Sequence, residues 1–291
     1  MAELHRDSFL SGQYFLAVAG MAAMRRILSR PSEGRPRLDD MRAVLDAFDE
    51  FPNNIEIDVV EHDVASGYQA WAPVYDGPNP AIEAEQPIVH DMIRQLAVGR
   101  ALDAACGTGR HAGFLAELGH DTIGVDATAG MLDVARSNHP DVDFRSGRLE
   151  ALPVDDASVD VVTSALAVCH APELGPVFAE FARVLAPGGS VIVSDPHPTT
   201  VHFGGVAGFR DADADPTAGF TLPFVANLHH PMHTYVEAAI GAGLTVAECR
   251  EPTFPQSGLE ANPAYAIVPD AVRQAFEGLP FIVIWRFTKA A

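Results

Sequence analysis

The sequence predicts an α/β protein built on a doubly wound, mostly parallel sheet. Residues 100–126 have the pattern of a buried strand, a glycine-rich turn, a helix and a second strand that ends in an acid. Predicted strands and helices then alternate up to residue 198, which is typical of parallel strands joined by crossover helices. The last two predicted strands, 244–250 and 281–288, have no helix between them, so the final strand is expected to be antiparallel.

The strand and turn at residues 100–109 give the strongest indication of a ligand-binding site. The strand is nearly all apolar, as expected of a strand covered on both faces, and contains one acid, Asp103. Gly107 and Gly109 follow, and glycine lets a backbone approach a ligand closely. A ligand is therefore expected above the carboxyl ends of the strands, where Asp126 closes the second strand.

Two kinds of ligand fit this unit. Gly107, Gly109 and Ala112 satisfy the loose G-x-G-x-x-G/A pattern for a dinucleotide, with Asp126 as the ribose ligand. A dinucleotide enzyme would normally keep the approach to its pyrophosphate uncharged, whereas here Asp103 lies in the first strand. A carboxylate at this place suits a ligand that carries a positive charge.

The segment LDAACGTG, residues 102–109, resembles the first motif of class I S-adenosylmethionine-dependent methyltransferases, whose common form is LDxGCGTG. Ala105 replaces the first glycine, which changes little if the strand stays extended through it. The resemblance covers residues 100–198. It implies a Rossmann-like, seven-stranded sheet in the order 3-2-1-4-5-7-6 and S-adenosyl-L-methionine as the cofactor. In this reading Asp126 binds the ribose hydroxyls, and Asp103 orients the loop or receives the amino group of the methionine moiety.

Residues 147–160 resemble the family only in part. Many relatives have an acid after the glycine that accepts the adenine amino group, whereas this chain has Arg148 and Leu149. Because arginine cannot accept that hydrogen bond, adenine is expected to contact backbone atoms or Glu150. The predicted cofactor contacts are Tyr75, Asp103, Ala105, Gly107, Gly109, Asp126, Ala127, Met131, Arg148, Leu149 and Ala165.

The first 60 residues are predicted to be a helical appendage to a domain that spans residues 61–291. Helices are expected at residues 8–29 and 39–51, and the link at residues 30–37, rich in Pro, Gly and Arg, is expected to be loose. Such an appendage can pack against the domain, form a homodimer, or act as a lid on the substrate side.

An aromatic cluster precedes the first core helix. Tyr68, Trp71 and Tyr75 lie within residues 62–80, and the WAPVYD run resembles the segment that covers the cofactor in many small-molecule methyltransferases. Aromatic faces attract a sulfonium cation through their quadrupole. The alternative is that these rings only bury area against the core.

The other core elements follow from apolar patterning and turn signals. Helices are predicted at residues 81–98, 110–118, 128–138, 173–185 and 232–242, and strands at residues 122–125, 142–144, 159–167 and 191–193. Insertions are expected at residues 199–231, which include the acidic stretch DADAD, and at residues 252–279. The family resemblance implies that they build the acceptor pocket, which agrees with the general rule that connecting loops carry specificity.

Histidines are the candidate bases. His170 follows the carboxyl end of the fourth strand and His197 that of the fifth, so both are predicted catalytic residues that would deprotonate an acceptor near pH 7. For each, the alternative is a structural hydrogen bond. The cluster His229, His230 and His233 suggests a metal site, because imidazoles are good metal ligands. Pro231 breaks the regular helix that would place two of them on one face, so no metal is predicted.

Net charge, cysteine spacing and apolar patterning indicate which partners and which cellular location to expect. A net charge of -20 argues against a nucleic-acid partner, which requires a basic patch. Three separated cysteines form neither a disulfide ladder nor a metal spacing, so the cytoplasm is the expected location. The apolar segment Tyr14 to Met24 has the charge order of neither a signal peptide nor a membrane span, and no membrane partner is expected.

The resemblance to class I methyltransferases implies S-adenosylmethionine-dependent methyl transfer to the oxygen, nitrogen or carbon of a small acceptor of natural-product type. One alternative keeps the cofactor but uses its sulfonium as an electrostatic catalyst of cyclisation or rearrangement. Another is an NAD(P)-dependent reductase, which needs a proton donor such as Tyr-x-x-x-Lys, and the only lysine is Lys289.

Overall fold

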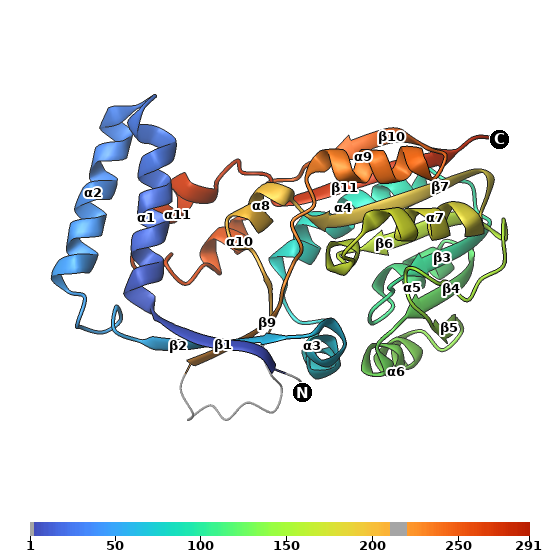
Figure 1. Ribbon diagram of the computed structural model, residues 1–291, viewed down its shortest axis with the longest axis horizontal. Helices are drawn as coiled ribbons and strands as arrows, with labels where there is room; N and C mark the ends of the chain where they lie inside the picture. Colours follow the sequence, from blue (N-terminus) through green and yellow to red (C-terminus); the bar gives the residue numbers. More distant parts are fainter. Residues whose placement is uncertain (1–2, 210–219) are drawn as a thin grey trace.

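The computed structural model describes residues 3–209 and 220–291 and has the predicted α/β architecture (Figure 1). Its central sheet has seven strands in the spatial order β10 (Leu244–Arg250), β11 (Ile282–Lys289), β7 (Leu185–Pro196), β6 (Val159–Ala165), β3 (Arg100–Ala104), β4 (Asp121–Asp126) and β5 (Asp143–Ser146). Of these seven strands, β11 alone runs in the direction opposite to the other six. Counted along these core strands alone, this is the predicted order 3-2-1-4-5-7-6; the labels differ because other strands form a second sheet.

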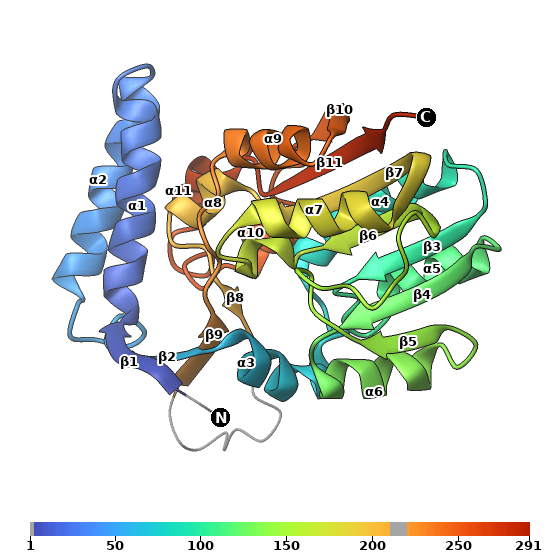
Figure 2. The same ribbon diagram turned by 45° about the vertical axis from the view of Figure 1, so that its right-hand side comes forward.

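Helices cover both faces of the central sheet (Figure 2). The helices of the core are α4 (Pro80–Arg94), α5 (Arg110–Glu117), α6 (Ala129–Asn138), α7 (Leu174–Val184) and α9 (Met232–Gly241). Successive residues of a strand point to opposite faces. Leu102 therefore joins the apolar cluster under α7 and α9, while Ala101 joins the cluster under α4 and α5.

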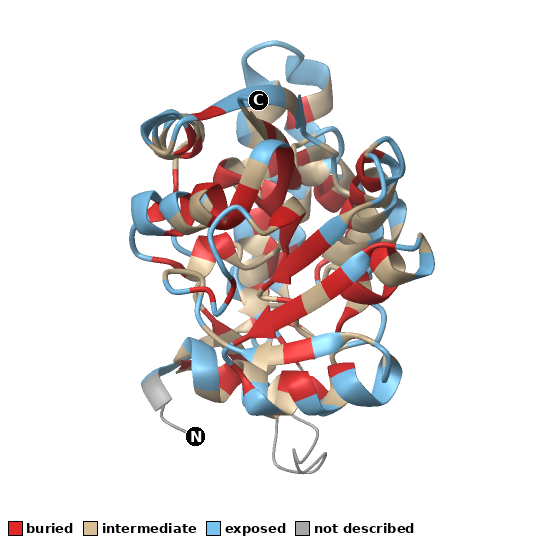
Figure 3. Cartoon of the chain, turned by 90° about the vertical axis from the view of Figure 1, so that its right-hand side faces the viewer, coloured by how far each residue is buried: buried red, intermediate tan, exposed pale blue. Residues whose placement is uncertain are grey.

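Three of the largest fully buried side chains, Phe178, Phe181 and Phe287, belong to the apolar cluster between the sheet and α7. Phe178 contacts Phe287 edge to face, with ring centroids 5.3 Å apart, and neither ring is exposed. Figure 3 shows the buried residues concentrated along the central strands. The ends of these strands are consequently held firmly, and any site at their carboxyl ends rests on a rigid base.

The N-terminal segment differs from the predicted helical appendage. It contains α1 (Ser11–Ile27) and α2 (Pro31–Asp46), but also β1 (Glu3–Leu10) and β2 (Glu56–His62). The predicted loose link at residues 30–37 is wrong, because α2 already begins at Pro31. A proline at the first helical position presets the backbone, and a Cβ at Gly34 would lie 3.0 Å from the Ile27 backbone, so the two helices meet closely.

A second sheet joins the N-terminal segment to the insertion at residues 199–231. Its order is β1, β2, β9 (Phe220–Val225) and β8 (Ala207–Gly208), and β2 pairs in parallel with β9. The acidic stretch DADAD of that insertion lies outside the described residues.

The insertion at residues 252–279 packs on the N-terminal helices. It forms α10 (Gln256–Glu260) and α11 (Pro269–Phe276), and one apolar cluster contains Phe15 and Ala22 of α1 together with Val272 of α11. Short elements complete the chain: α3 (Val64–Trp71), η1 (Ala72–Val74), η2 (Val168–His170) and α8 (Pro198–His202). Among the helices in residues 3–209 and 220–291, none has the length and apolar character that crossing a bilayer requires.

Candidate active site

A cavity of about 240 Å³, here called the loop cavity, lies where β3, β4 and β6 end. It is lined by Val64, Ala65, Tyr68, Tyr75, Ala105, Gly107, Asp126, Ala127, Thr128, Met131, Gly147, Arg148, Leu149, Glu150, Ala165, Leu166, Ala167, His170, Ala171 and Pro172. Nine of the eleven predicted cofactor contacts are in this lining, and so is Glu150. The carboxyl ends of parallel strands meet at one edge of the sheet, which explains why residues from distant motifs converge there.

Asp126 holds the glycine loop in place. Its carboxylate accepts hydrogen bonds from the backbone N–H of Gly107, at 2.9 Å, and of Thr128, at 2.8 Å. Burial raises the pKa of Asp126, and these two hydrogen bonds oppose that rise. Each carboxylate oxygen keeps a lone pair, so the side chain can accept further donors from a ligand in the cavity.

The backbone beside Asp126 is left-handed at two positions. Gly107 has φ 54°, and a Cβ built there would meet only the Tyr75 ring, 4.0 Å away, so the loop leaves open space. Ala105 has φ 58°. The condition under which the Ala105 replacement changes little is therefore not met: β3 ends at Ala104, and Ala105, where the family motif has glycine, adopts a left-handed conformation. A non-glycine residue there is strained by roughly 1–2 kcal/mol.

Asp103 and Gly109 lie outside the loop cavity. The Asp103 carboxylate is buried and accepts from the Ala112 N–H at 2.9 Å and the Thr163 hydroxyl at 2.8 Å, so it orients the loop and the start of α5. Of its two predicted roles, this is the one that the contacts match. Gly109 also serves local packing, since a Cβ there would lie 2.9 Å from His139.

Residues 62–80, which carry Tyr68, Trp71 and Tyr75 and are here called the aromatic segment, cover the loop cavity. Trp71 contacts Tyr75 edge to face, with ring centroids 4.9 Å apart, and stacks on Tyr68 at 5.7 Å. Two hydrogen bonds fasten the segment to the core: the Thr108 hydroxyl donates to Asp76 at 2.6 Å, and the Gly130 N–H donates to the Gln69 side chain. The rings are thus tied to the loop that borders the cavity.

Tyr68 and His170 form a hydrogen-bonded pair at the edge of the loop cavity. The Nδ1 atom of His170 lies 3.0 Å from the Ala226 carbonyl oxygen, which accepts only, so Nδ1 carries the proton. The Nε2 atom then carries the lone pair and accepts a hydrogen bond from the Tyr68 hydroxyl at 2.8 Å. Burial lowers the pKa of His170, which favours this neutral form near pH 7.

His197 lines neither the loop cavity nor the larger cavity described below, so its predicted catalytic role stays a prediction without support from the lining. Its Nδ1 accepts the Thr199 N–H at 3.1 Å as the N-cap of α8, so Nε2 carries the proton and donates to Glu251 at 2.8 Å. With both nitrogens engaged, the ring has a structural role. The adjoining Pro198, at the first helical position, is the signal that marks such a cap.

The histidines of the insertion do not form a metal centre. His230 is buried, and its Nε2 donates to the Ala171 carbonyl at 2.9 Å, while the His229 ring packs against His202. Within the described part of the chain, no group of three or more His, Cys, Asp or Glu side chains is arranged to hold a metal ion.

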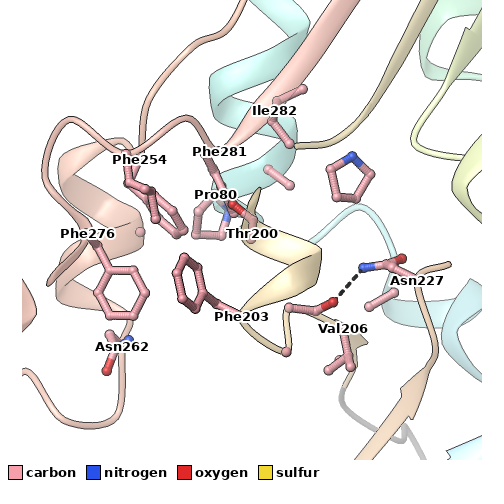
Figure 4. Close-up of a pocket in the computed structure, with 18 of the residues that line it drawn as sticks. Pro80, Thr200, Phe203, Val206, Asn227, Phe254, Asn262, Phe276, Phe281 and Ile282 are labelled. Carbon is pink, nitrogen blue, oxygen red and sulfur yellow. Dashed lines mark hydrogen bonds between the residues drawn. The ribbon is translucent and has the colours of Figure 1, made fainter. Parts of the chain in front are cut away.

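A second cavity, of about 640 Å³ and here called the apolar cavity, adjoins the first. Tyr68, Tyr75 and Leu166 line both. The apolar cavity is bounded by α1, the aromatic segment, residues 200–208 and the 252–279 insertion, and its lining includes Tyr14, Val18, Met21, Met24, Trp71, Thr200, Phe203, Val206, Asn227, Phe254, Asn262, Phe276, Leu279, Phe281 and Ile282. Figure 4 shows the rings of Phe203, Phe254, Phe276 and Phe281 gathered on one side of it.

The sequence did not identify the Tyr68–His170 pair. Tyr68 was noted only as one ring of an aromatic cluster, and it lies 102 residues before its partner. No local pattern reports such a contact. A polar tip on an otherwise apolar ring was the one available signal, since a buried tyrosine hydroxyl usually finds a partner.

Comparison with known proteins assigns the core. Residues 102–193 match the family model described as a methyltransferase domain. A demethylmenaquinone methyltransferase from Renibacterium salmoninarum is 35% identical over 143 residues, which is 47% of this chain and 60% of that protein. A malonyl-[acyl-carrier protein] O-methyltransferase from Yersinia pestis is 43% identical over 93 residues, 32% of this chain and 35% of its own length. The chain thus spans about a third to three-fifths of these curated relatives.

Solved structures agree on the fold. An S-adenosylmethionine-dependent methyltransferase from Mesorhizobium loti superposes with a TM-score of 0.52 at 23% identity, covering 71% of this chain and 98% of that one. The cyclase SpnF superposes with a TM-score of 0.54 at 19% identity, covering 78% and 96%. The predicted fold is confirmed. The family match over residues 102–193 agrees with a methyltransferase domain in the core of the chain.

Proposed function

We propose that this chain, whose residues 102–193 form a methyltransferase domain, transfers a methyl group from S-adenosyl-L-methionine to a small-molecule acceptor. The observation that carries the proposal is the pair of adjoining cavities. The loop cavity brings together the glycine loop and Asp126, and the apolar cavity meets it at Tyr68, Tyr75 and Leu166. Such an arrangement offers one space for a donor and another for an acceptor.

The residues of the loop cavity suit the cofactor. The open space over Gly107 lets a ligand lie close to the backbone, and the Asp126 carboxylate can accept hydrogen bonds from two ribose hydroxyl groups. Met131 and Leu149 provide apolar contacts for adenine, and the aromatic face of Tyr75 suits a sulfonium cation. Arg148 is exposed and pairs with Glu150 at 3.5 Å, so its backbone is the more suitable contact.

S-Adenosyl-L-methionine supplies an electrophilic methyl group on a positively charged sulfur. The side chains of this protein have to orient an acceptor and receive its proton. The hydroxyl oxygen of Tyr68 can accept a proton from an acceptor hydroxyl while its own proton moves to Nε2 of His170. His170 then becomes an imidazolium ion, whose Nδ1–H remains bonded to the Ala226 carbonyl.

A nicotinamide-dependent reductase fits less well. The Asp103 carboxylate already accepts the Ala112 N–H in the first turn of α5, where a pyrophosphate would approach. The only lysine, Lys289, donates to the carbonyls of Ala182 and Leu185 and lines neither cavity.

Calorimetric titration tests the proposal. We expect S-adenosylhomocysteine to bind and NADH not to bind. Asp126→Ala should weaken S-adenosylhomocysteine binding at least about tenfold, because the carboxylate that accepts hydrogen bonds from both ribose hydroxyls is lost. Asp121→Ala, at the exposed start of the same strand, is the matched control and should leave the affinity unchanged. Binding of NADH alone would contradict the proposal.

The alternative chemistry keeps the cofactor but transfers no methyl group. Mass analysis separates the two readings: methyl transfer adds the mass of one methylene to the acceptor and releases S-adenosylhomocysteine. A product of unchanged mass, with no S-adenosylhomocysteine formed, would favour cyclisation or rearrangement.

The finer parts of the function are also proposals. Natural-product biosynthesis in the cytoplasm suits a small acceptor, and cell fractionation tests the location. A homodimer through the N-terminal helices is supported by large apolar side chains exposed at the end of α1 and beside it, namely Ile27 and Leu28. Sedimentation equilibrium at the monomer mass would refute the dimer. The absence of a nucleic-acid partner rests on the net charge of -20.

A further inference from the structure

We infer that the apolar cavity binds the acceptor and that this acceptor is an uncharged, largely apolar molecule whose hydroxyl group reaches Tyr68. This inference rests on the proposed function, since it identifies the second substrate of the same site. It excludes acceptors held by an ionic group, such as a phosphate or a carboxylate.

The first support is the absence of charge. Charged residues make up 20% of the chain, yet among the described residues that line the apolar cavity none is Asp, Glu, Lys, Arg or His. A buried ionic group of a ligand would lose its hydration there without gaining a partner of opposite charge. A neutral ligand avoids that loss.

The second support is that most polar side chains of the lining are already bonded within the protein. Asn262 donates to the Tyr14 hydroxyl at 2.9 Å, and Thr200 donates to the Pro280 carbonyl at 3.0 Å. Asn227 donates to the Gly205 carbonyl, as the dashed line in Figure 4 shows. These groups have little capacity left for a polar ligand, so shape and apolar contact must supply most of the affinity.

The third support is the exposure of apolar side chains at the cavity. Phe203 is 52% exposed and Met24 64% exposed, although both are large and apolar. Phe203 lies beside the rings of Phe254 and Phe276 (Figure 4). Large apolar side chains that line a cavity and remain exposed mark a surface for an apolar ligand.

The position of the reacting group follows from the shared residues. Tyr68 lines both cavities, and its hydroxyl is bonded to the lone pair of Nε2 of His170. A hydroxyl group of the acceptor placed at this junction would lose its proton to the Tyr68–His170 pair as its oxygen forms the new bond to the methyl carbon. The carbon–sulfur bond breaks in the same step, and its electron pair stays on sulfur, which becomes neutral.

Two probes that share one ring system test the charge requirement. N-Phenyl-1-naphthylamine is neutral, and 8-anilino-1-naphthalenesulfonate carries an added sulfonate. The chain has two tryptophans, so Trp285→Phe leaves Trp71, which lines the apolar cavity, as the sole reporter of binding. We expect the neutral probe to quench Trp71 emission and to bind at least about tenfold more tightly than the sulfonate.

Phe203→Arg places a positive charge at the cavity, and we expect it to weaken the neutral probe and strengthen the sulfonate. Phe220→Arg, at an exposed phenylalanine outside both cavities, should change neither. Equal or tighter binding of the sulfonate by the chain with Phe203 intact would overturn the inference, and so would neutral-probe binding that is insensitive to Phe203→Arg. Calorimetry with S-adenosylhomocysteine on the same samples reports the donor site separately, so loss of the proposed function is told apart from a wrong acceptor class.

Discussion

Asp195 makes the stability of this protein depend on pH in a direction that can be worked out. Its side chain has no exposed surface, and its carboxylate accepts the Tyr235 hydroxyl at 2.9 Å and the Cys169 N–H at 3.1 Å. Burial raises the pKa of Asp195 to about 7, and the hydrogen bonds only partly oppose it. The charged form is therefore disfavoured in the folded protein.

The sign follows from linkage. The folded pKa lies above the unfolded value of 3.8, so the stability tied to Asp195 is fully present below pH 3.8 and is lost as the pH rises through 7. Between pH 5 and pH 8 the loss amounts to about 2–3 kcal/mol of unfolding free energy, at about 1.4 kcal/mol per pKa unit. Asp195→Asn cannot titrate, and its amide can retain both hydrogen bonds by turning its N–H toward the Tyr235 oxygen.

Urea unfolding followed by circular dichroism at pH 5, 6, 7 and 8 measures this effect. The unfolding free energy of the wild type, minus that of Asp195→Asn, should fall by about 2–3 kcal/mol over this range, mostly between pH 5 and pH 7, and level off above pH 7. Thr245→Ala, at an exposed position of the same sheet without a titratable side chain, should give a difference that does not change with pH. A flat or rising difference for Asp195→Asn would show that the carboxylate is ionised without penalty in the folded state.

Three further predictions concern the site. Ala105→Gly should stabilise the protein by up to about 1 kcal/mol, because glycine accepts the left-handed backbone and its greater unfolded-state entropy only partly offsets the gain; a lower denaturation midpoint would contradict this. Tyr68→Phe should slow methylation of a hydroxyl acceptor by about 10²-fold with unchanged S-adenosylhomocysteine affinity, and Tyr265→Phe, outside both cavities, should not. Because burial lowers the pKa of His170, the wild-type rate should fall only below about pH 6.5, and a persisting acid limb in His170→Asn would assign that limb to another group.

The core of the fold was predictable because it depends on local patterns. Short apolar runs bounded by Gly or Pro predicted the strands of the central sheet, and two strands without an intervening helix predicted that the last one is antiparallel. The second sheet was missed, because β2 pairs with β9, more than 150 residues further along the chain. Neither strand carries a local signal of that pairing.

The same distinction explains which site residues could be predicted. Gly107, Asp126 and Ala165 were assigned correctly to one edge, because parallel strands bring their carboxyl ends together whatever the rest of the chain does. His197 satisfied the same rule and yet lies outside both cavities, because the backbone turns there into α8 and uses the imidazole as a cap. A strand end therefore fixes where a residue lies, while the next turn decides where its side chain points. Neither rule could predict the position of Tyr68, because this residue lies on a segment outside the sheet that folds back over the strand ends.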